Sequence, residues 1–468
     1  MASRLSSLYF PRFDGQPHGI RGKERWQVMP NAKSRFESWG RYPLIESEVH
    51  RLRWMSDFSA EKLPSGDLLP VGVGRSYGDV CLLDNGTLLA TSDLDRLIEF
   101  NAETGLLRCE AGVTLAQILD FAVPRGYFLP VTPGTKFVTV GGALANDIHG
   151  KNHHIAGTFG SWVLRFELMR TDGTRMICSP TENAEWFRAT IGGLGLTGLI
   201  LWAEFQLKPI VTRRIRYAGE KFVGIDEFVE LSHAAAKVEY SVAWIDCVAS
   251  GRNFARGIFM LGEHDDQPEP LTVSRKAWLS FPVNLPELAL NRASIGLFNT
   301  LYYNKQFGKR VEKRIDYEPF FYPLDSVQHW NRMYGKAGLL QFQCALPWEA
   351  GKQRGITRIL EEITKSGLAS FLAVIKVFGD VRSPGMMTFP MPGITLALDF
   401  PIRRQTSFAL LQRLAEITVE YGGRMYPAKD ALMTPPQFQA FYPQWEQFQK
   451  YIDPRLNSAF WKRVTANV

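Results

Sequence analysis

Three glycine-rich segments within residues 70–198 limit what the first half of the chain can fold into. They read PVGVGRSYGD, TPGTKFVTVGGALANDIHGKNHH and ATIGGLGLTG. None contains the Gly-Lys-Ser/Thr ending of a P-loop, and none has the GxGxxG spacing of a dinucleotide-binding βαβ unit. Glycine lets backbone N–H groups approach a pyrophosphate without a Cβ in the way. Three such segments, separated by apolar stretches, predict a long phosphate-bearing cofactor that threads through this domain.

The hydrophobic pattern around these segments predicts short strands mixed with a few helices. Hairpin turns are expected at residues 103–105 and 171–173, where strand-like runs flank Glu-Thr-Gly and Thr-Asp-Gly. Residues 114–126 switch to a helical period, with Thr114 as the N-cap and Pro124 limiting the C-terminal end. This order is typical of an α+β fold and not of a regular βαβ alternation.

The rhythm changes after Arg213. Helices are expected over 224–238, 352–367 and 407–423, and strands over 239–249, 253–262, 339–347, 371–380 and 394–402. This order predicts a second α+β domain, an antiparallel sheet covered by helices on one face. Residues 265–335 are Pro-rich, aromatic and irregular. They are either a long loop packed over the second domain or a mobile lid that contacts a membrane.

Length and composition set the broad class of protein. A chain of 468 residues exceeds one ordinary core, so we expect two domains. The net charge of +7 favours anionic ligands or lipid headgroups, but no basic block resembles a nucleic-acid-binding tail. We see neither a signal peptide nor an apolar run of the roughly 18 residues that span a bilayer, which predicts a cytoplasmic or peripheral membrane protein. Five scattered cysteines predict neither a disulfide framework nor a thiolate metal site: Cys81, Cys109, Cys178, Cys247 and Cys344.

Sequence motifs in both halves resemble one family. GVGRSYGD, TPGT…TVGGALA, HGKNHH…GTFG and GGLGLTG resemble the FAD-binding domain of vanillyl-alcohol-oxidase type flavoproteins. More closely, they resemble the flavoprotein subunits of decaprenylphosphoryl-β-D-ribose 2-epimerases. The resemblance continues through YSVAWID, FFYPLD…HWNR, LLQFQ, FLAVIKVFG, PMPG…LDFPI and GGRMYPAKDA, and so covers nearly the whole chain.

The resemblance implies a two-part FAD-binding domain of the PCMH type. Residues 1–212 would form its first part, 213–423 a substrate-binding domain, and 424–468 a C-terminal return to the FAD-binding domain. Related enzymes often attach FAD covalently through a histidine, where this chain has Arg75, so we expect non-covalent FAD. The matching positions predict these cofactor-binding residues: Val71, Gly72, Val73, Gly74, Arg75, Ser76, Tyr77, Pro133, Gly134, Thr135, Thr139, Val140, Gly141, Gly142, Asn146, His149, Gly150, Asn152, Gly193, Gly198, Ile200 and Tyr426.

The segment HGKNHH (149–154) could be a metal site, but adjacent His153 and His154 cannot easily point at one ion, and no carboxylate or cysteine cluster accompanies them. We therefore predict no metal site, and expect these two histidines to satisfy buried backbone groups. In the similar family this stretch borders the flavin. The resemblance thus implies that His149 lies in the active site and that Lys151 contacts an anionic group.

Further pocket residues follow from the same resemblance. Lys429 is the first candidate at the reacting centre, either as a neutral amine that takes the hydroxyl proton or as a charge that stabilises the reduced flavin. Tyr77 and His149 complete the predicted catalytic set. The predicted substrate-binding residues are Lys151, Gln341, Gln343, Lys376 and Ala397. Gln341 and Gln343 would face one side of a strand. Ala397 stands where mycobacterial members of the family carry cysteine, a thiol that hydride transfer does not require.

Three functions are compatible with these residues. The first is oxidation of the 2-hydroxyl of a polyprenyl-phosphoryl ribose, with a separate NAD(P)H-dependent short-chain reductase completing the epimerisation to the arabinose form. The second is an oxygen-using oxidase of a free sugar, alditol or aldonolactone. The third is a non-catalytic flavin-binding scaffold. Lysines in the pocket and an apolar segment at 277–303 favour the first, with possible contact to a membrane surface.

Overall fold

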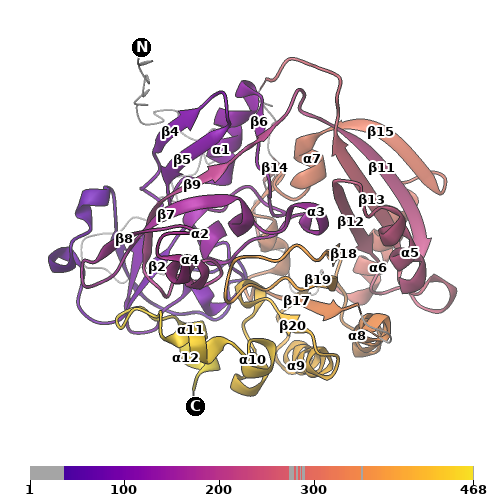
Figure 1. Ribbon diagram of the computed structural model, residues 1–468. Helices are drawn as coiled ribbons and strands as arrows, with labels where there is room; N and C mark the ends of the chain where they lie inside the picture. The colour runs from indigo at the N-terminus through magenta and orange to yellow at the C-terminus, as the bar shows by residue number, and fades with distance from the viewer. Residues whose placement is uncertain are drawn as a thin grey trace.

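The computed structural model describes residues 36–272, 279–280, 283–284, 286, 290–348 and 352–466. Figure 1 shows the first half of the chain on one side, a large sheet on the other, and the C-terminal helices, in yellow, returning beneath the first half. Helices and antiparallel sheets are mixed without a regular βαβ alternation, so the α+β prediction is confirmed.

Two sheets of three and five strands form most of the first half, beside a short pairing of β6 (Tyr127–Phe128) with β10 (Lys208–Pro209). A parallel sheet of order β1-β3-β2 contains Glu48–Arg51, Thr87–Ala90 and Leu68–Val71. An antiparallel sheet of order β4-β5-β9-β7-β8 contains Leu97–Asn101, Leu106–Glu110, Leu199–Gln206, Val163–Met169 and Arg175–Cys178. Both predicted hairpins are confirmed, because β4 pairs with β5 and β7 pairs with β8.

Short helices connect these strands: α1 (Leu115–Ala122), α2 (Val140–Ala145), α3 (His153–Ala156) and α4 (Ala184–Thr190). The predicted start of α1 is confirmed, because the Gln117 backbone N–H donates to Thr114 Oγ1 at 3.2 Å. A side-chain cap of this kind satisfies one of the free N–H groups of the first turn.

An eight-stranded antiparallel sheet dominates the second half, in the order β15-β11-β13-β12-β18-β19-β17-β20. Its strands are Arg310–Asp316, Arg214–Val223, Arg256–His264, Tyr240–Ile245, Ala373–Phe378, Gly393–Pro401, Leu339–Pro347 and Arg424–Met425. Helices α5 (Ile225–Ala234), α8 (Lys352–Ser366) and α9 (Arg404–Glu420) share the apolar core on one face of its strands. The predicted helix-covered sheet is therefore confirmed.

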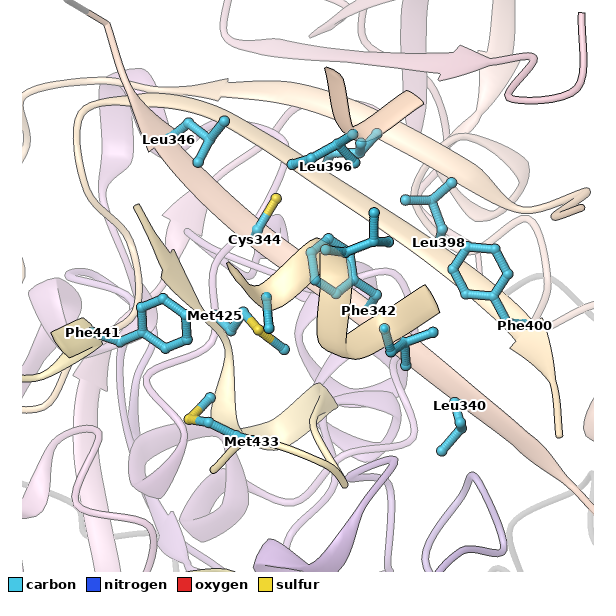
Figure 2. Packing of buried hydrophobic residues seen from close by; sticks show 14 of the residues in the cluster. Leu340, Phe342, Cys344, Leu346, Leu396, Leu398, Phe400, Met425, Met433 and Phe441 are labelled. Atoms are coloured by element: carbon cyan, nitrogen blue, oxygen red, sulfur yellow. The ribbon is translucent and has the colours of Figure 1, made fainter. Parts of the chain in front are cut away.

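The side-chain alternation of β17 and β19 separates the core from the cavity side of this sheet. Leu340, Phe342 and Cys344 are buried in one apolar cluster with Leu396 and Leu398. Figure 2 shows this cluster closed by side chains from the C-terminal segment, including Met425, Met433 and Phe441. Because successive side chains of a strand point to opposite faces, the intervening residues of both strands face the other way.

The expectation of an irregular segment over 265–335 is wrong in part. The structure contains α6 (Arg292–Asn304), β15 and α7 (Tyr317–Phe321) there. Strand β15, with the sequence RVEKRID, lies at a sheet edge and carries charged side chains, which hid its strand character. The apolar segment expected over 277–303 includes Trp278, Phe281, Leu285 and Leu288, which lie outside the described residues. No helix in the described ranges is long and apolar enough to cross a membrane.

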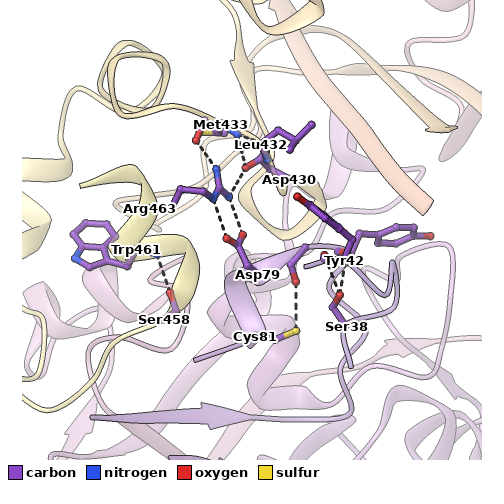
Figure 3. Close-up of polar contacts among 12 residues, drawn as sticks. Ser38, Tyr42, Asp79, Cys81, Asp430, Leu432, Met433, Ser458, Trp461 and Arg463 are labelled. Atoms are coloured by element: carbon purple, nitrogen blue, oxygen red, sulfur yellow. Dashed lines mark hydrogen bonds and ion pairs between the residues drawn. The ribbon is translucent and has the colours of Figure 1, made fainter. Parts of the chain in front are cut away.

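The C-terminal segment, with α10 (Pro435–Phe441), α11 (Trp445–Gln449) and α12 (Ala459–Val464), packs on the first half. Figure 3 shows Arg463 of α12 between two buried carboxylates. Its Nη2 lies 2.7 Å from Asp79 Oδ1 and 2.9 Å from Asp430 Oδ2. Asp79 is the last residue of the first glycine-rich segment and Asp430 follows Lys429, so one guanidinium joins these two segments.

Candidate active site

One cavity of about 1490 Å³ runs between the first half of the chain and the open face of the eight-stranded sheet. All predicted catalytic and substrate-binding residues line it, together with most of those predicted for the cofactor. The latter are Val71, Gly72, Val73, Gly74, Arg75, Ser76, Tyr77, Pro133, Gly134, Thr135, Thr139, Gly141, Gly142, Asn146, His149, Gly150, Gly198, Ile200 and Tyr426.

Three residues predicted to bind the cofactor do not line this cavity. Val140 is fully buried in the apolar core around α1 and α2. Asn152 is buried behind the wall, where its Nδ2 donates to the Pro130 carbonyl at 2.8 Å. Gly193 packs against α4, since a Cβ there would lie 2.2 Å from the Ala189 carbonyl oxygen. All three residues therefore pack in the layer that lies beneath the residues lining the cavity.

The first glycine-rich segment offers a cradle for phosphate groups. Within the described residues, the backbone N–H groups of residues 72–76 donate no hydrogen bond to protein atoms. A Cβ on Gly72 would lie 2.4 Å from Thr139 Oγ1, so glycine lets this loop meet the second glycine-rich segment. Unpaired N–H groups in a loop that lines a cavity suit an anionic diphosphate.

The open face of the large sheet delivers polar side chains from three neighbouring strands. Gln341 and Gln343 of β17 lie opposite Asp399 and Ala397 of β19, and Thr395 of β19 lies opposite Lys376 of β18. Gln341 and Gln343 both line the cavity, so the prediction that they share one side is confirmed. Thr395 also lines the cavity and was missed, because a threonine in an apolar strand gives no distinctive signal.

His149 forms the wall between the sheet and the glycine-rich segments. Its Nε2 lies 3.0 Å from Gln343 Nε2, an amide donor, which leaves the ring proton on Nδ1. Within the described chain, this buried Nδ1 has no hydrogen-bond partner. Burial, followed by the charges of Lys376, His153 and Lys429, holds the pKa of His149 well below its usual range. A neutral ring with a free N–H is suited to donate to a bound group.

The other histidines of HGKNHH lie outside the cavity wall. His154 Nε2 lies 2.8 Å from the Val238 carbonyl oxygen, which confirms its predicted contact with a buried backbone group. His153 instead packs against the Phe378 ring at 4.6 Å between centroids, and its nitrogens have no partner among the described residues. Among all the residues that the structure describes, no group of three or more histidine, cysteine, aspartate or glutamate side chains could hold a metal ion.

Lys429 lies above Tyr77, with Nζ 3.8 Å from the ring centroid. The Tyr77 backbone N–H donates to the Ala428 carbonyl at 2.9 Å, which fixes the two segments side by side. Burial lowers the pKa of Lys429 to about 8, against the opposing effect of Asp399. An amine with such a pKa can exchange a proton near neutral pH.

Asp399 is a polar residue of this site that sequence reasoning missed. Gln341 Nε2 donates to its Oδ1, and within the described residues its Oδ2 has no hydrogen-bond partner. Burial raises the pKa of Asp399 to about 7, while Gln341 and Lys429 oppose the shift. A signal was present in the sequence, because a carboxylate in the apolar strand ITLALDF is costly to bury without a charged partner.

Two further lysines line the cavity, Lys376 on strand β18 and Lys151 on the second glycine-rich segment. Lys376 Nζ donates to the Gly150 carbonyl at 2.8 Å, and Lys151 Nζ donates to the carbonyls of Phe320 and Phe321. In the described chain neither has an ion-pair partner. Burial lowers the pKa of each to about 7, and for Lys376 the nearby charges of Lys151 and Lys429 add to the effect. An incoming anion would stabilise their charged forms.

A second group of missed residues surrounds Arg75. Its guanidinium lies 4.1 Å from the Trp39 ring centroid. Burial lowers the pKa of Arg75, and the charge of Asp325 opposes this shift. Asp325 Oδ2 also accepts from the Lys136 backbone N–H at 2.9 Å. Trp39, Lys136 and Asp325 come from separate segments, so only the folded chain brings them to one wall of the cavity.

Comparisons with known proteins agree with this geometry. An FAD binding domain model matches residues 55–179. Decaprenylphosphoryl-beta-D-ribose oxidase of Mycolicibacterium smegmatis is 35% identical over 82% of this chain and 85% of its own length. The chain belongs to this oxidase family. An uncharacterized protein of Streptomyces coelicolor is 31% identical over 73% of this chain and 96% of its own length. Mouse L-gulonolactone oxidase is 31% identical over only 30% of this chain and 31% of its own length.

As a member of the decaprenylphosphoryl-beta-D-ribose oxidase family, this chain is an FAD-dependent oxidoreductase that acts on a CH–OH group. The cavity fits FAD in two respects. Residues 72–76 present free backbone N–H groups, and Asn146 Oδ1 and His149 Nδ1 are buried without protein partners in the described chain. The family model ends at residue 179, so the sheet that carries the two glutamines and Lys376 lies outside its match.

Proposed function

We propose that this chain oxidises the 2-hydroxyl of a polyprenyl-phosphoryl-β-D-ribose to the 2-keto sugar. The observation that carries the proposal is the pair of cavity lysines without ion-pair partners in the described chain, Lys151 and Lys376. Their charged forms would bind the phosphoryl group, because buried ammonium groups need an anion to offset their desolvation. Gln341 and Gln343 would hydrogen-bond the sugar hydroxyls.

The proposed architecture places FAD in a two-part domain formed by residues 1–212 and 424–468, with 213–423 covering the flavin and holding the sugar. Supporting this division, β11 begins at Arg214, and the C-terminal helices pack on the first half through Arg463. We propose that FAD is held non-covalently, because Arg75 cannot form the histidyl bond found in related flavoproteins.

In the proposed reaction the carbinol C–H bond breaks as a hydride and the O–H bond as a proton. FAD, once bound, would supply the two-electron oxidant for this hydride transfer. Lys429 takes the proton at Nζ as a neutral amine, and Asp399 with the Tyr77 ring stabilises the ammonium that forms. His149 holds Gln343 on the sheet and presents its free Nδ1–H to the cavity. The keto sugar then needs hydride from a separate NAD(P)H-dependent reductase to give the arabinose form.

The proposed function is tested by anaerobic titration of the FAD-loaded protein with polyprenyl-phosphoryl ribose, following flavin absorbance. Bleaching by the phosphorylated sugar, but not by free ribose, is expected. The alternative is an oxidase of free sugars or aldonolactones, which the gulonolactone oxidase matches suggest for less than a third of the chain. Bleaching by a free aldonolactone with rapid oxygen uptake would support that alternative.

A further inference from the structure

An exposed apolar patch lies on α6 and the turn that follows it. We call it the α6 patch and define it as Leu297, Phe298, Leu301 and Phe307, with exposed fractions of 63%, 45%, 63% and 88%. Leu297 and Leu301 lie one helical turn apart, so they share one face. Large apolar side chains gathered in this way on a soluble surface mark an interaction site.

The helix is anchored by its opposite face, so its exposed side chains are held outward by the fold. Ile295 is buried at 3% exposure, and Asn299 is fully buried. Asn299 Nδ2 donates to Asp246 Oδ1 at 2.8 Å, and Arg256 donates to Thr300 Oγ1 at 3.1 Å. These contacts fix which face of α6 points to solvent.

Two lysines beside the patch carry charge without an ion-pair partner in the described chain. Lys305 Nζ lies 3.4 Å from the Tyr302 ring centroid, and Lys313 Nζ lies 5.2 Å from the Tyr217 ring centroid. Burial lowers the pKa of Lys305, and the charge of Lys313 adds to this, so the two ammonium groups lie near one another. Lys309 pairs with Glu227, and Arg310 pairs with Glu220 and Glu312. These two cations therefore contribute less net positive charge to this surface than Lys305 and Lys313.

The same two tyrosines connect the patch to the cavity. Tyr302 and Tyr217 both line it, next to Trp244, Met260 and Ile315. Trp244 and Tyr302 pack at 4.7 Å between ring centroids. This end of the cavity is therefore aromatic and apolar, with Lys305 and Lys313 at its rim and the α6 patch beyond them.

We propose that the α6 patch docks the protein on an anionic lipid bilayer, so that the cavity opens toward the membrane that holds the substrate's polyprenyl chain. This inference rests on the proposed function for the identity of the substrate, and on the patch alone for the docking. Leu297, Leu301 and Phe307 insert among the acyl chains, while Lys305 and Lys313 meet the phosphate headgroups. The lipid chain then lies along the apolar end of the cavity.

Vesicle co-sedimentation of the FAD-loaded protein tests the docking. Wild type should bind vesicles of phosphatidylcholine with phosphatidylglycerol more tightly than vesicles of phosphatidylcholine alone, and salt should weaken the binding. The variant L297S/L301S/F307S should bind at least about tenfold more weakly. K305Q/K313Q should lose about fivefold per lysine on the mixed vesicles alone. The matched control L44S/L164S changes two exposed leucines elsewhere and should bind like wild type.

Activity measurements separate this inference from the proposed function. L297S/L301S/F307S should reduce its flavin at the wild-type rate with a short-chain, water-soluble polyprenyl-phosphoryl ribose, and more slowly with the long-chain substrate in vesicles. Wild-type binding by this variant, or equal binding to both vesicle types, would overturn the docking and leave the proposed function intact. A wild-type dimer that the same substitutions dissociate in lipid-free buffer would assign the patch to a protein interface and also overturn it. If wild-type protein binds vesicles but neither substrate bleaches its flavin, the proposed function would be overturned and the docking would stand.

Discussion

Replacing Asp399 by Asn tests how the buried carboxylate acts on Lys429. Burial lowers the pKa of Lys429 to about 8 while Asp399 raises it, so loss of the carboxylate charge lowers this pKa further. Asparagine keeps an oxygen that can accept from Gln341, so the change is mainly one of charge. An opposite charge in a buried site contributes on the order of one pKa unit or more, and we use one unit for the estimate.

The direction follows from the role proposed for Lys429. A lysine that acts as a base must be neutral, and its neutral fraction grows as pH rises through its pKa. At pH 8, where Asp399 with its pKa of about 7 is mostly ionised, lowering the pKa of Lys429 by about one unit from about 8 raises its neutral fraction from about one-half to about nine-tenths. The acidic limb of kcat/KM should therefore move to lower pH by about one unit. The plateau at high pH should fall, because the ammonium that forms has lost its counter-charge.

The assay is the pH profile of kcat/KM for flavin reduction, with FAD content measured on each sample. D266N serves as control because Asp266 is exposed and pairs with Arg216, so its profile should match wild type. An alkaline limb that moves to lower pH, with the acidic limb unchanged, would show that the ammonium form is the active one. An unchanged profile would show that Asp399 does not act on Lys429.

Three further predictions follow from the site and its supports. Lys429→Ala should keep FAD but lose about 100-fold or more in kcat/KM for flavin reduction, and reduction at the normal rate would exclude Lys429 from the reaction. Acid precipitation should release FAD into the supernatant, since Arg75 cannot attach it, whereas a flavin-peptide mass in the pellet would contradict non-covalent binding. Arg463→Met should lower the free energy of unfolding in urea by about 3–5 kcal/mol and weaken FAD retention, because Asp79 and Asp430 would be left buried without their cation. An unchanged urea midpoint would show that this ion-pair cluster contributes nothing to the fold.

Local patterns in the sequence predicted the elements whose cause is local. The cap at Thr114, both hairpins of the first half and the helix-covered sheet follow from turn chemistry and periodicity. The common side of Gln341 and Gln343 follows from the strand period of two. Strand β15 was not predicted, because its exposed edge position needs no apolar alternation. Helix α6 was not predicted, because its apolar residues face solvent as well as the core.

The candidate site could be predicted only where motifs mark it. Lys429, His149 and the glycine loops belong to recognisable stretches, and they all line one cavity. The role of Asp399 depends on Lys429, which lies thirty residues further along the chain. The role of Asp325 likewise depends on Arg75 and Lys136, which belong to other segments. Such partners meet through tertiary packing, which periodicity and spacing do not contain.

The bridge made by Arg463 has a consequence for how the protein is made. It joins Asp79 to a residue 384 positions later in the chain, and the same guanidinium holds Asp430, the residue next to Lys429. Contacts between such distant positions form late in folding, because closing so long a loop costs conformational entropy that is offset only once the intervening chain is ordered. On the ribosome, the loop that cradles the cofactor emerges long before the helix that fixes it. The cofactor pocket is therefore completed only after α12 has been synthesised and packed, so FAD capture is expected as a late step of folding.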